Sequence, residues 1–486
     1  MNAKKTARKG LRKTKMIVIL VVVFEILGIM SAVHAVMSAR TPQGSIAWAV
    51  SLVTFPYVSV PAYWVLGRNK FHGYVLARRK EIDGLAQVFR ETNTLLDSAL
   101  IDESERRGAI KAAETLARSP LTDGNRADLL IDGQATFDSI FQGIDAAEKY
   151  VLVQFYIVRD DDLGQQLQDK LIEAASRGVR VLFLFDEIGS VGLSAAYRRR
   201  FEDAGIALRP FHSRKGSGNR FQLNFRNHRK TVVVDGKVAW IGGHNVGDEY
   251  LGKDVAIGNW RDTHVRLQGP VAISAQLAFV EDWRWATDSM PDDLTWTPTR
   301  APEDDMLAIV MPTGPADEME TASLIFTGVI NAAQRRVWIA SPYFVPDDAV
   351  VQALQLAGLR GVDVRILIPE KADSMLVTLA AYAFFDQIKA AGVKFYRYND
   401  GFLHQKVVLV DDSFATVGTA NFDNRSFRLN FEITAAIANP DFAAEVSSML
   451  EADFAKARLM KIGEYDKKPF WFKLAVRTAR LTAPVL

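Results

Sequence analysis

The stretch Asn227–Asn245, Asn-His-Arg-Lys-Thr-Val-Val-Val-Asp-Gly-Lys-Val-Ala-Trp-Ile-Gly-Gly-His-Asn, decides the fold because the chain carries it twice. The second copy is Leu403–Asn421, Leu-His-Gln-Lys-Val-Val-Leu-Val-Asp-Asp-Ser-Phe-Ala-Thr-Val-Gly-Thr-Ala-Asn. A His, a Lys, an Asp, a Gly and an Asn recur in identical register. These residues are His228, Lys230, Asp235, Gly242 and Asn245, and then His404, Lys406, Asp411, Gly418 and Asn421. Such a repeat predicts two similar halves.

Each copy predicts a β-hairpin. Thr231–Val234 and Val407–Val410 are short β-branched or aliphatic runs closed by Asp-Gly or Asp-Asp-Ser, and both endings are turn sequences. A second apolar run follows at Val238–Ile241 or Phe414–Val417. Because side chains at i and i+2 share one strand face, each His and its Lys can address the same phosphate. We expect the Asn to return beside that His, the Gly to leave room for an anion, and the Asp at the turn to be structural.

The duplicated His-x-Lys-x4-Asp motif, with its Gly and Asn, resembles the phospholipase D superfamily. Tyr250–Gly252 and Trp260–His264 (Trp-Arg-Asp-Thr-His) are similar to bacterial cardiolipin synthases in particular. The resemblance covers roughly Asp128 to Arg458. It implies an α/β protein with a duplicated phospholipase D-like fold, in which two similar mixed-sheet halves pack about a pseudo-twofold axis and the motifs meet.

The resemblance also implies a two-step phosphoryl displacement at the shared site. His228 is the expected nucleophile and His404 the expected acid/base, although the near symmetry of the sequence leaves the reverse order open. Four donors are expected to hold the non-bridging phosphate oxygens: Lys230, Lys406, Asn245 and Asn421.

Two carboxylates follow the motifs, Asp262 in Trp-Arg-Asp-Thr-His and Glu432 in Asn-Phe-Glu. By resemblance each orients an imidazole and stabilises its cation, and an ordinary surface carboxylate is the alternative. His244 and His264 have no repeat partner, and we expect them to be structural or to line the substrate rim. The repeat also departs from identity at Gly243 and His244, where the second copy has Thr and Ala, so the two substrate positions are not expected to be equivalent.

Composition excludes several kinds of site. The chain has 486 residues, 49% of them hydrophobic, which suffices for a large core and more than one domain. It has no cysteine, and therefore no disulfide framework, thiolate nucleophile or cysteine-based metal site. The seven histidines lack metal-binding spacings. We expect no metal and no cofactor.

The N-terminus predicts membrane insertion. Residues 1–15 contain seven basic residues and no acidic one. Met16–Met37 and Ile46–Leu66 are apolar runs, each long enough to cross a ~30 Å hydrocarbon core as a helix. Pro56 and Pro61 should kink the second helix without forbidding it. We predict a two-helix transmembrane hairpin. The alternative is a secretory signal peptide with a cleavage site near Val33-His34-Ala35.

Positive charge flanks both outer ends of this predicted hairpin, while the loop between the helices has only Arg40. The positive-inside rule therefore predicts that both ends lie in the cytoplasm. The expected location is the bacterial inner membrane, with several passes and a cytoplasmic catalytic region.

The sequence divides into five predicted parts. These are a basic N-terminus with two transmembrane helices (1–67), a helical juxtamembrane connector (68–126), the two phospholipase D-like halves (127–300 and 301–463), and a basic amphipathic C-terminal segment (464–486). In the halves, the strand-like runs Val151–Val158 and Val337–Val345 end in acidic clusters, which we expect to cap helices rather than bind metal. The C-terminal segment suits either the membrane interface or docking onto the protein.

The setting indicates the substrate. A phosphodiester site tethered to a bilayer should act on phospholipids, and the basic loop Ser213–Arg229, including Arg220 and Arg226, is expected to bind anionic headgroups. A solvated basic loop is the alternative. The expected reaction joins two phosphatidylglycerols into cardiolipin and glycerol. We expect no nucleic-acid partner, and the resemblance implies a homodimer. The alternatives are a phospholipase D that hydrolyses or uses other alcohols, a membrane-anchored nuclease, and a non-catalytic membrane scaffold.

Overall fold

The computed structural model describes residues 2–39, 41–67, 74, 108–211, 224–302, 305–461 and 463–486. The chain forms two compact units, Met1–Gly73 with Ser213–Phe225, and Tyr74–His212 with Arg226–Leu486. Most of the predicted connector and most of the basic loop, with Arg220, lie outside the described residues.

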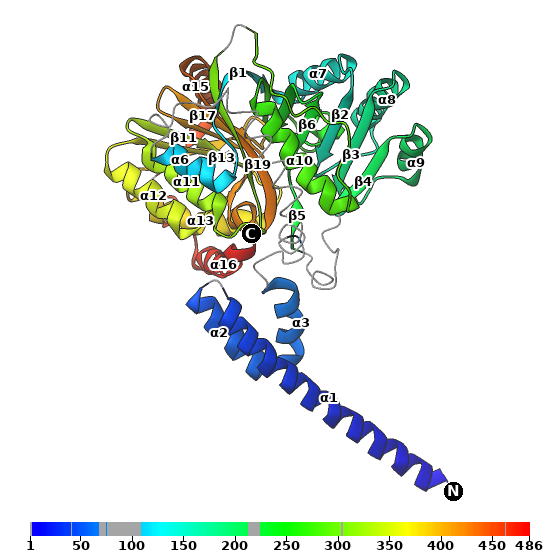
Figure 1. Ribbon diagram of the computed structural model, residues 1–486. Helices are drawn as coiled ribbons and strands as arrows, with labels where there is room; N and C mark the ends of the chain where they lie inside the picture. Colours follow the sequence, from blue (N-terminus) through cyan, green and yellow to red (C-terminus); the bar gives the residue numbers. More distant parts are fainter. Residues whose placement is uncertain are drawn as a thin grey trace. The chain divides into compact units, whose positions relative to one another are not determined.

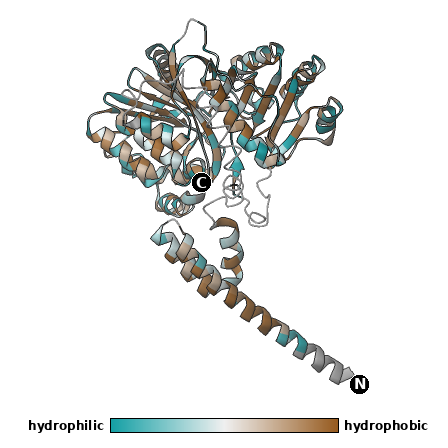
Figure 2. Ribbon diagram, in the orientation of Figure 1, coloured by the Kyte–Doolittle hydropathy of each residue, from teal (hydrophilic) through white to brown (hydrophobic). Residues whose placement is uncertain are grey.

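The N-terminal unit contains one helix that could cross a membrane. In α1 (Asn2–Ser38), the stretch Arg12–Ser38 is long and apolar enough by length and composition, and Figure 2 shows it hydrophobic beyond its N-terminal part. The second apolar run instead forms two helices, α2 (Pro42–Thr54) and α3 (Pro56–Leu66). At 1.5 Å per residue they are about 20 Å and about 17 Å long, each shorter than a hydrocarbon core. The predicted two-helix hairpin is therefore not confirmed.

Proline explains this break. Pro56 has no backbone N–H and restricts the backbone conformation of the residue before it. Helix α2 therefore ends at Thr54, and Phe55 leaves the helical region at φ −134° and ψ 57°. The short helices still pack on α1. A Cβ at Gly28 would lie 2.4 Å from the Leu52 carbonyl oxygen, so α1 and α2 approach closely there. His34 Nδ1 lies 2.6 Å from the Tyr63 hydroxyl, which links α1 to α3.

The larger unit is built on one sheet that repeats its strand order (Figure 1). The first half runs β1 (Thr122–Ile131), β9 (Thr263–Gln268), β7 (Val238–Gly242), β6 (Thr231–Val234), β2 (Tyr150–Phe155), β3 (Arg180–Asp186) and β4 (Ala207–Phe211). The second half runs β10 (Met306–Thr313), β19 (Asn430–Ala438), β17 (Phe414–Gly418), β16 (Val407–Val410), β11 (Arg336–Ala340), β13 (Asp363–Pro369), β14 (Lys394–Tyr398) and β20 (Ala457–Leu459). The halves join where β1 pairs antiparallel with β10. This is the duplicated mixed α/β fold.

Helices flank the sheet in the same order in each half. The first half has α7 (Asp132–Asp145), α8 (Asp162–Ser176), α9 (Ala195–Asp203) and α10 (Val271–Thr287), and the second has α11 (Thr321–Ala332), α12 (Asp348–Leu359), α13 (Met375–Lys389) and α15 (Pro440–Ala455). The acidic clusters after β2 and β11 cap helices, since Asp161 accepts from the Gly164 N–H at 3.0 Å and Asp347 from the Val350 N–H at 3.1 Å. The predicted strand 337–345 is divided, because β11 ends at Ala340 and β12 is only Phe344–Val345.

Both predicted hairpins form, β6 with β7 and β16 with β17. Their aspartates hold the turns. Asp235, at φ 54°, accepts the N–H groups of Glu148, Lys149 and Tyr150. Asp411, at φ 50°, accepts those of Gln334, Arg335 and Arg336. Each carboxylate thus ties its turn to the backbone that leads into the neighbouring strand.

The motif glycines have a different role from the one we expected. A Cβ at Gly242 would lie 2.5 Å from His264 Cα, and a Cβ at Gly418 would lie 2.6 Å from Thr434 Oγ1. The space beside each glycine is filled by the adjacent strand, β9 or β19. The expectation of room for an anion there is wrong: the missing side chain lets two strands pack closely.

The turn aspartates make a stability prediction. Asp235→Ala leaves three backbone N–H groups without their acceptor, so we expect the free energy of unfolding to fall by about 1–3 kcal/mol. Chemical unfolding followed by tryptophan fluorescence would measure the change. Asp160→Ala, at an exposed position, is the control. An unfolding midpoint for Asp235→Ala equal to that of this control would contradict the structural role.

Candidate active site

Two short strands place the motif histidines against the opposite half. β5 (Arg226–Asn227) pairs with the first residues of β19, and the His228 N–H then donates to the Phe431 carbonyl at 2.9 Å. β15 (Phe402–Leu403) pairs with β8 (Trp260–Arg261), and the His404 N–H donates to the Arg261 carbonyl at 2.8 Å. Backbone from the other half therefore fixes each histidine.

The residue after each of those carbonyls is one of the predicted carboxylates. His228 Nδ1 donates to Glu432 at 2.9 Å, and His404 Nδ1 donates to Asp262 at 2.7 Å. Both carboxylates are fully buried. Because an ionised carboxylate only accepts, these contacts place the hydrogen of each neutral ring on Nδ1 and the lone pair on Nε2. Lys406 Nζ also lies 2.8 Å from His404 Nδ1, and in this tautomer it donates to the His404 carbonyl and not to the ring. The pairs are crossed between halves, which the sequence did not indicate.

An aromatic ring packs against each imidazole. Tyr156 lies edge-on to His228 with ring centroids 4.9 Å apart. Trp260 lies 5.0 Å from His404. These contacts restrict the orientation of rings that are already held at Nδ1.

The motif lysines join the two motifs electrostatically. Lys230 Nζ donates to the His228 carbonyl at 2.7 Å, and Lys406 Nζ donates to the His404 carbonyl. The positive charge of Lys406 contributes to lowering the pKa of His228, and that of Lys230 contributes to lowering the pKa of His404. The four side chains therefore belong to one buried site whose positive charge suits a phosphate.

Burial governs protonation in this site. It lowers the pKa of His228 to about 4 and that of His404 to about 3. It also lowers the pKa of Lys230 to about 7 and that of Lys406 to about 8. Both imidazoles are therefore neutral at pH 7 before substrate binds, as a nucleophile requires. Burial alone would raise the pKa of Asp262, but Lys406 and His404 hold it well below its usual range.

The two predicted asparagines differ in their partners. Asn245 Oδ1 accepts the Ile157 N–H at 3.0 Å, and its Nδ2 donates to the Tyr250 hydroxyl at 3.2 Å. Asn421 is buried and its Oδ1 has no hydrogen-bond partner in the described structure. The side chain of Asn245 thus makes two hydrogen bonds within the protein, whereas the side-chain oxygen of Asn421 can accept one from a ligand. A phosphate-binding role for either amide stays a prediction.

The repeat departs from symmetry beside the carboxylates. Thr419 Oγ1 donates to Glu432 at 2.6 Å, and Asn430 Nδ2 donates to it at 3.1 Å. Beside Asp262 stands Gly243, where a Cβ would lie 1.9 Å from Asp262 Oδ1. The shorter acid therefore needs the glycine, and the longer acid is held by the threonine hydroxyl.

The remaining predicted residues lie near the site. His244 and His264 are buried beside each other, with their Nδ1 atoms 3.1 Å apart. Arg226 precedes His228 by two residues, and burial lowers its pKa while Asp186 opposes that shift. Its role as a substrate-binding residue stays a prediction. No group of three His, Asp or Glu side chains in the described part of the chain could hold a metal ion.

Sequence reasoning missed two buried aspartates behind the motifs. Asp282 accepts from Asn227 Nδ2 at 2.7 Å and from Arg229 Nη1 at 2.9 Å, so it fixes the side chains of both neighbours of His228. Asp453 accepts from Arg261 Nε at 2.7 Å and from Gln405 Nε2 at 3.1 Å. The available signal was an Asp followed by an aromatic residue near the C-terminal end of a helix in each half, Asp282-Trp283 and Asp453-Phe454.

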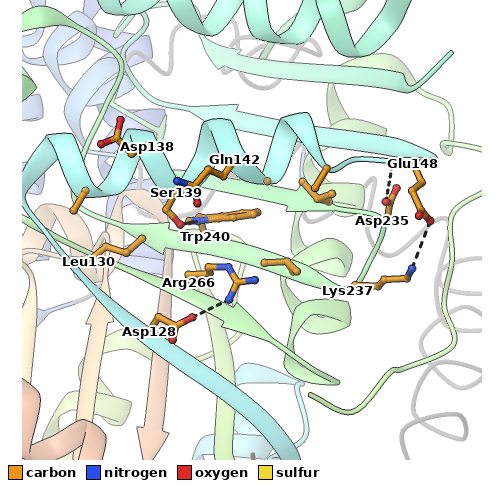
Figure 3. A pocket seen from close by; sticks show the side chains of 15 residues that line it. Asp128, Leu130, Asp138, Ser139, Gln142, Glu148, Asp235, Lys237, Trp240 and Arg266 are labelled. Atoms are coloured by element: carbon orange, nitrogen blue, oxygen red, sulfur yellow. Dashed lines mark hydrogen bonds and ion pairs between the residues drawn. The ribbon is translucent and has the colours of Figure 1, made fainter. Parts of the chain in front are cut away.

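A cavity of about 600 Å³ lies elsewhere in the first half, between α7 and strands β1, β7 and β9. Figure 3 shows Trp240 and Arg266 on its floor, with Arg266 paired to Asp128. Of the motif residues, only Asp235 lines it. This cavity is therefore separate from the histidine site.

Comparisons with known proteins agree with this geometry. The family model described as "Cardiolipin synthase, PLD-like domain" matches residues 140–258 and 326–454, and a "Phospholipase_D-nuclease N-terminal" model matches residues 26–68. The fold is similar to the crystal structure of phosphatidylserine synthase from Haemophilus influenzae, with a TM-score of 0.58 and 15% identity over 78% of this chain and all of that one. Fold and repeated motif together define a phospholipase D-like protein.

Sequence similarity is more specific. Cardiolipin synthase A of Pseudomonas fluorescens is 47% identical over 470 residues, which are 96% of this chain and 98% of that protein. Cardiolipin synthase A of Pseudomonas aeruginosa is 47% identical over 485 residues, 98% of each chain. The chain belongs to the cardiolipin synthase family.

The buried Arg229–Asp282 pair makes a second prediction. Asp282→Asn leaves the Arg229 guanidinium buried without its counter-charge, so we expect the free energy of unfolding to fall by about 3–5 kcal/mol. Arg229→Gln in the same chain should recover part of that loss, because Gln405 occupies the corresponding position of the second half. Chemical unfolding of the single and double variants measures both. A double variant less stable than Asp282→Asn would show that this pair is not the cause.

Proposed function

We propose that the histidine site transfers the phosphatidyl group of one phosphatidylglycerol to a second, which forms cardiolipin and releases glycerol. The observation that carries this is the pair of imidazoles, each held at Nδ1 by a buried carboxylate of the other half. Two such groups beside two lysines suit a double displacement at one phosphorus atom. Family membership supports the phospholipid substrate.

In the first step, His228 Nε2 attacks the phosphorus of the first lipid. The bond from phosphorus to the glycerol headgroup oxygen breaks, and protonated His404 gives its proton to that oxygen. Glu432 stabilises the positive charge that forms on the substituted His228 ring. Glycerol leaves, and the phosphatidyl group remains bound to His228 as a phosphohistidine.

In the second step, a headgroup hydroxyl of the second phosphatidylglycerol attacks the same phosphorus. Neutral His404 takes the hydroxyl proton, and the bond between phosphorus and His228 Nε2 breaks. Cardiolipin leaves and both histidines return to their starting states. Lys230 and Lys406 hold the non-bridging oxygens throughout.

The environments of the carboxylates support this order of roles. Asp262 accepts from His404 at the shorter distance, 2.7 Å, and its other donors are the Thr263 backbone N–H at 2.8 Å and the Trp260 indole at 3.5 Å. Glu432 instead accepts from the side chains of Thr419 and Asn430. An imidazolium acid needs such a counter-charge. The positive charge of Lys406 opposes protonation of His404, since together with burial it lowers the pKa of His404. The phosphodiester anion of the substrate opposes Lys406, so we infer that lipid binding brings the proton onto His404.

Membrane embedding is part of the proposal. The apolar stretch Arg12–Ser38 supports one membrane-spanning helix. The basic residues before it support an N-terminus in the cytoplasm. Multiple passes, a cytoplasmic catalytic region and a homodimer stay predictions.

Product analysis tests this function. Purified protein given phosphatidylglycerol vesicles should yield cardiolipin and free glycerol in equal amounts, measured by mass spectrometry and a glycerol assay. His228→Ala should abolish both, because no phosphohistidine can form. Phosphatidic acid without cardiolipin would show that water, not a lipid hydroxyl, attacks the intermediate, and the transfer would then be rejected.

The lysine pKa values predict a pH dependence. Lys230, whose pKa burial lowers to about 7, is charged below pH 7 and loses its charge above it. Anionic substrate should therefore bind more weakly as pH rises, and KM should increase between pH 6.5 and 8.5. Lys230→Arg keeps the charge, because guanidinium stays protonated, and should reduce this increase, leaving the part due to Lys406, whose pKa burial lowers to about 8.

Lys170→Arg is the matched control, since Lys170 is paired with Asp145 at the surface of the first half, and it should leave the profile unchanged. The measurement is KM for phosphatidylglycerol at a series of pH values. A Lys230→Arg profile with the same slope as the wild type would contradict the assignment.

A further inference from the structure

The C-terminal helix α16 (Phe470–Arg480) attaches to the catalytic unit through one face. Val476 and Ala479 are buried. Phe472 packs edge-on against Tyr382 of α13, with ring centroids 5.2 Å apart. These residues recur at helical spacing, so this face of α16 is occupied by the protein.

The opposite face carries large apolar side chains that the rest of the protein leaves exposed. Phe470 is 69% exposed, Trp471 74%, Leu474 44%, and Leu481, just after the helix, 79%. Phe470, Leu474 and Leu481 lie on one side of the helical path, and Trp471 extends it. We refer to these four residues as the α16 surface. An apolar surface of this kind indicates a binding partner.

Charge identifies the partner. Residues 467–486 contain five basic residues and no acidic one: Lys467, Lys468, Lys473, Arg477 and Arg480. Cations beside aromatic and aliphatic residues on a helix are typical of segments that lie in the interface of an anionic bilayer. The substrate class proposed for this protein is itself an anionic phospholipid. A lipid surface thus satisfies both the apolar face and the positive charge.

The α16 surface is connected to the second motif. The chain after α16 returns to α14 (Asn424–Arg428), where the Arg425 N–H donates to the Leu486 carbonyl at 2.7 Å. α14 begins three residues after the motif residue Asn421. On the other side, α13 begins two residues after Asp373, whose carboxylate acts on the pKa of Lys406. Both elements that hold the C-terminal segment therefore border the Lys406 side of the site.

From these contacts we infer that α16 lies in the lipid interface and holds the second-motif side of the site against the bilayer that supplies its substrate. The inference rests on the proposed function for the identity of the lipid. Phe470, Trp471, Leu474 and Leu481 enter the acyl boundary, and Arg477 binds anionic headgroups. Lys468 and Arg480 lie over the rings of Phe472 and Phe384 and add to the positive potential of the segment. No residue of α16 takes part in the chemistry.

A label tests lipid contact independently of activity. The chain has no cysteine, so Trp471→Cys in the full protein, reconstituted in nanodiscs, can carry a single NBD fluorophore. We expect a blue-shifted emission, protection from iodide, and quenching by nitroxide-labelled lipid in phosphatidylglycerol bilayers. Val191→Cys, at a 79% exposed position of the first half, is the matched control and should stay accessible to iodide. Equal iodide quenching at both positions would overturn the inference.

Kinetics separate lipid contact from a structural role. Phe470→Ser with Trp471→Ser should lower the rate about tenfold on phosphatidylglycerol in bilayers and leave it unchanged on substrate dispersed in detergent micelles. Equal losses in both would indicate a folding defect and contradict the inference. Arg477→Gln should weaken NBD insertion about fivefold in phosphatidylglycerol bilayers only, and an equal change in phosphatidylcholine bilayers would count against the charge assignment. If NBD inserts but no cardiolipin forms, the proposed reaction fails and the lipid contact stands.

Discussion

The crossed imidazole–carboxylate pairs are the constraint on which the rest of the catalytic unit depends. Asp262 and Glu432 are fully buried, and a buried carboxylate is costly unless it is paired. The partner of each is a histidine of the other half, held by a backbone hydrogen bond to the residue just before the carboxylate. Each carboxylate also has donors in its own half, but its imidazole partner comes from the other half. The antiparallel contact of β1 with β10 therefore joins two halves that need one another electrostatically.

The same pairs show how a duplicated fold becomes asymmetric without losing its geometry. In one pair the longer acid, Glu432, is braced by Thr419 and Asn430. In the other the shorter Asp262 fits only because Gly243 has no side chain. The longer acid stands beside a threonine and the shorter acid beside a glycine, and each imidazole has a short hydrogen bond to its carboxylate. What differs is the kind of donor beside each carboxylate, a backbone N–H and an indole at Asp262 and two side chains at Glu432, and this difference makes the surroundings of the two imidazoles unequal.

The sequence predicts what is repeated locally and fails where distant segments meet. The hairpins, the helix caps at Asp161 and Asp347 and the family follow from short patterns. The crossing of the carboxylates does not, because spacing along the chain cannot tell which imidazole Asp262 reaches. Asp282 was missed because an Asp beside Glu281 and Arg284 near a helix end resembles a surface charge, and its role shows only when Asn227 and Arg229 are in place. The second apolar run was misjudged as one kinked helix, since Pro56 ends the helix instead.

The cavity of Figure 3 marks a place where equivalent positions of the two halves carry different kinds of side chain. Strand register makes Asp128, paired with Arg266, the counterpart of Ile309, paired with Ala436. In the second half, Ile309 and Ala436 pack with Ala117 at the end of α6 (Ala109–Ala117). In the first half a cavity separates α7 from that face, and the corresponding residues form an ion pair instead. Polar side chains suit a floor that borders a cavity, whereas residues packed against a helix are apolar. Helix α6 thus distinguishes two halves that share one strand order and the same turn aspartates.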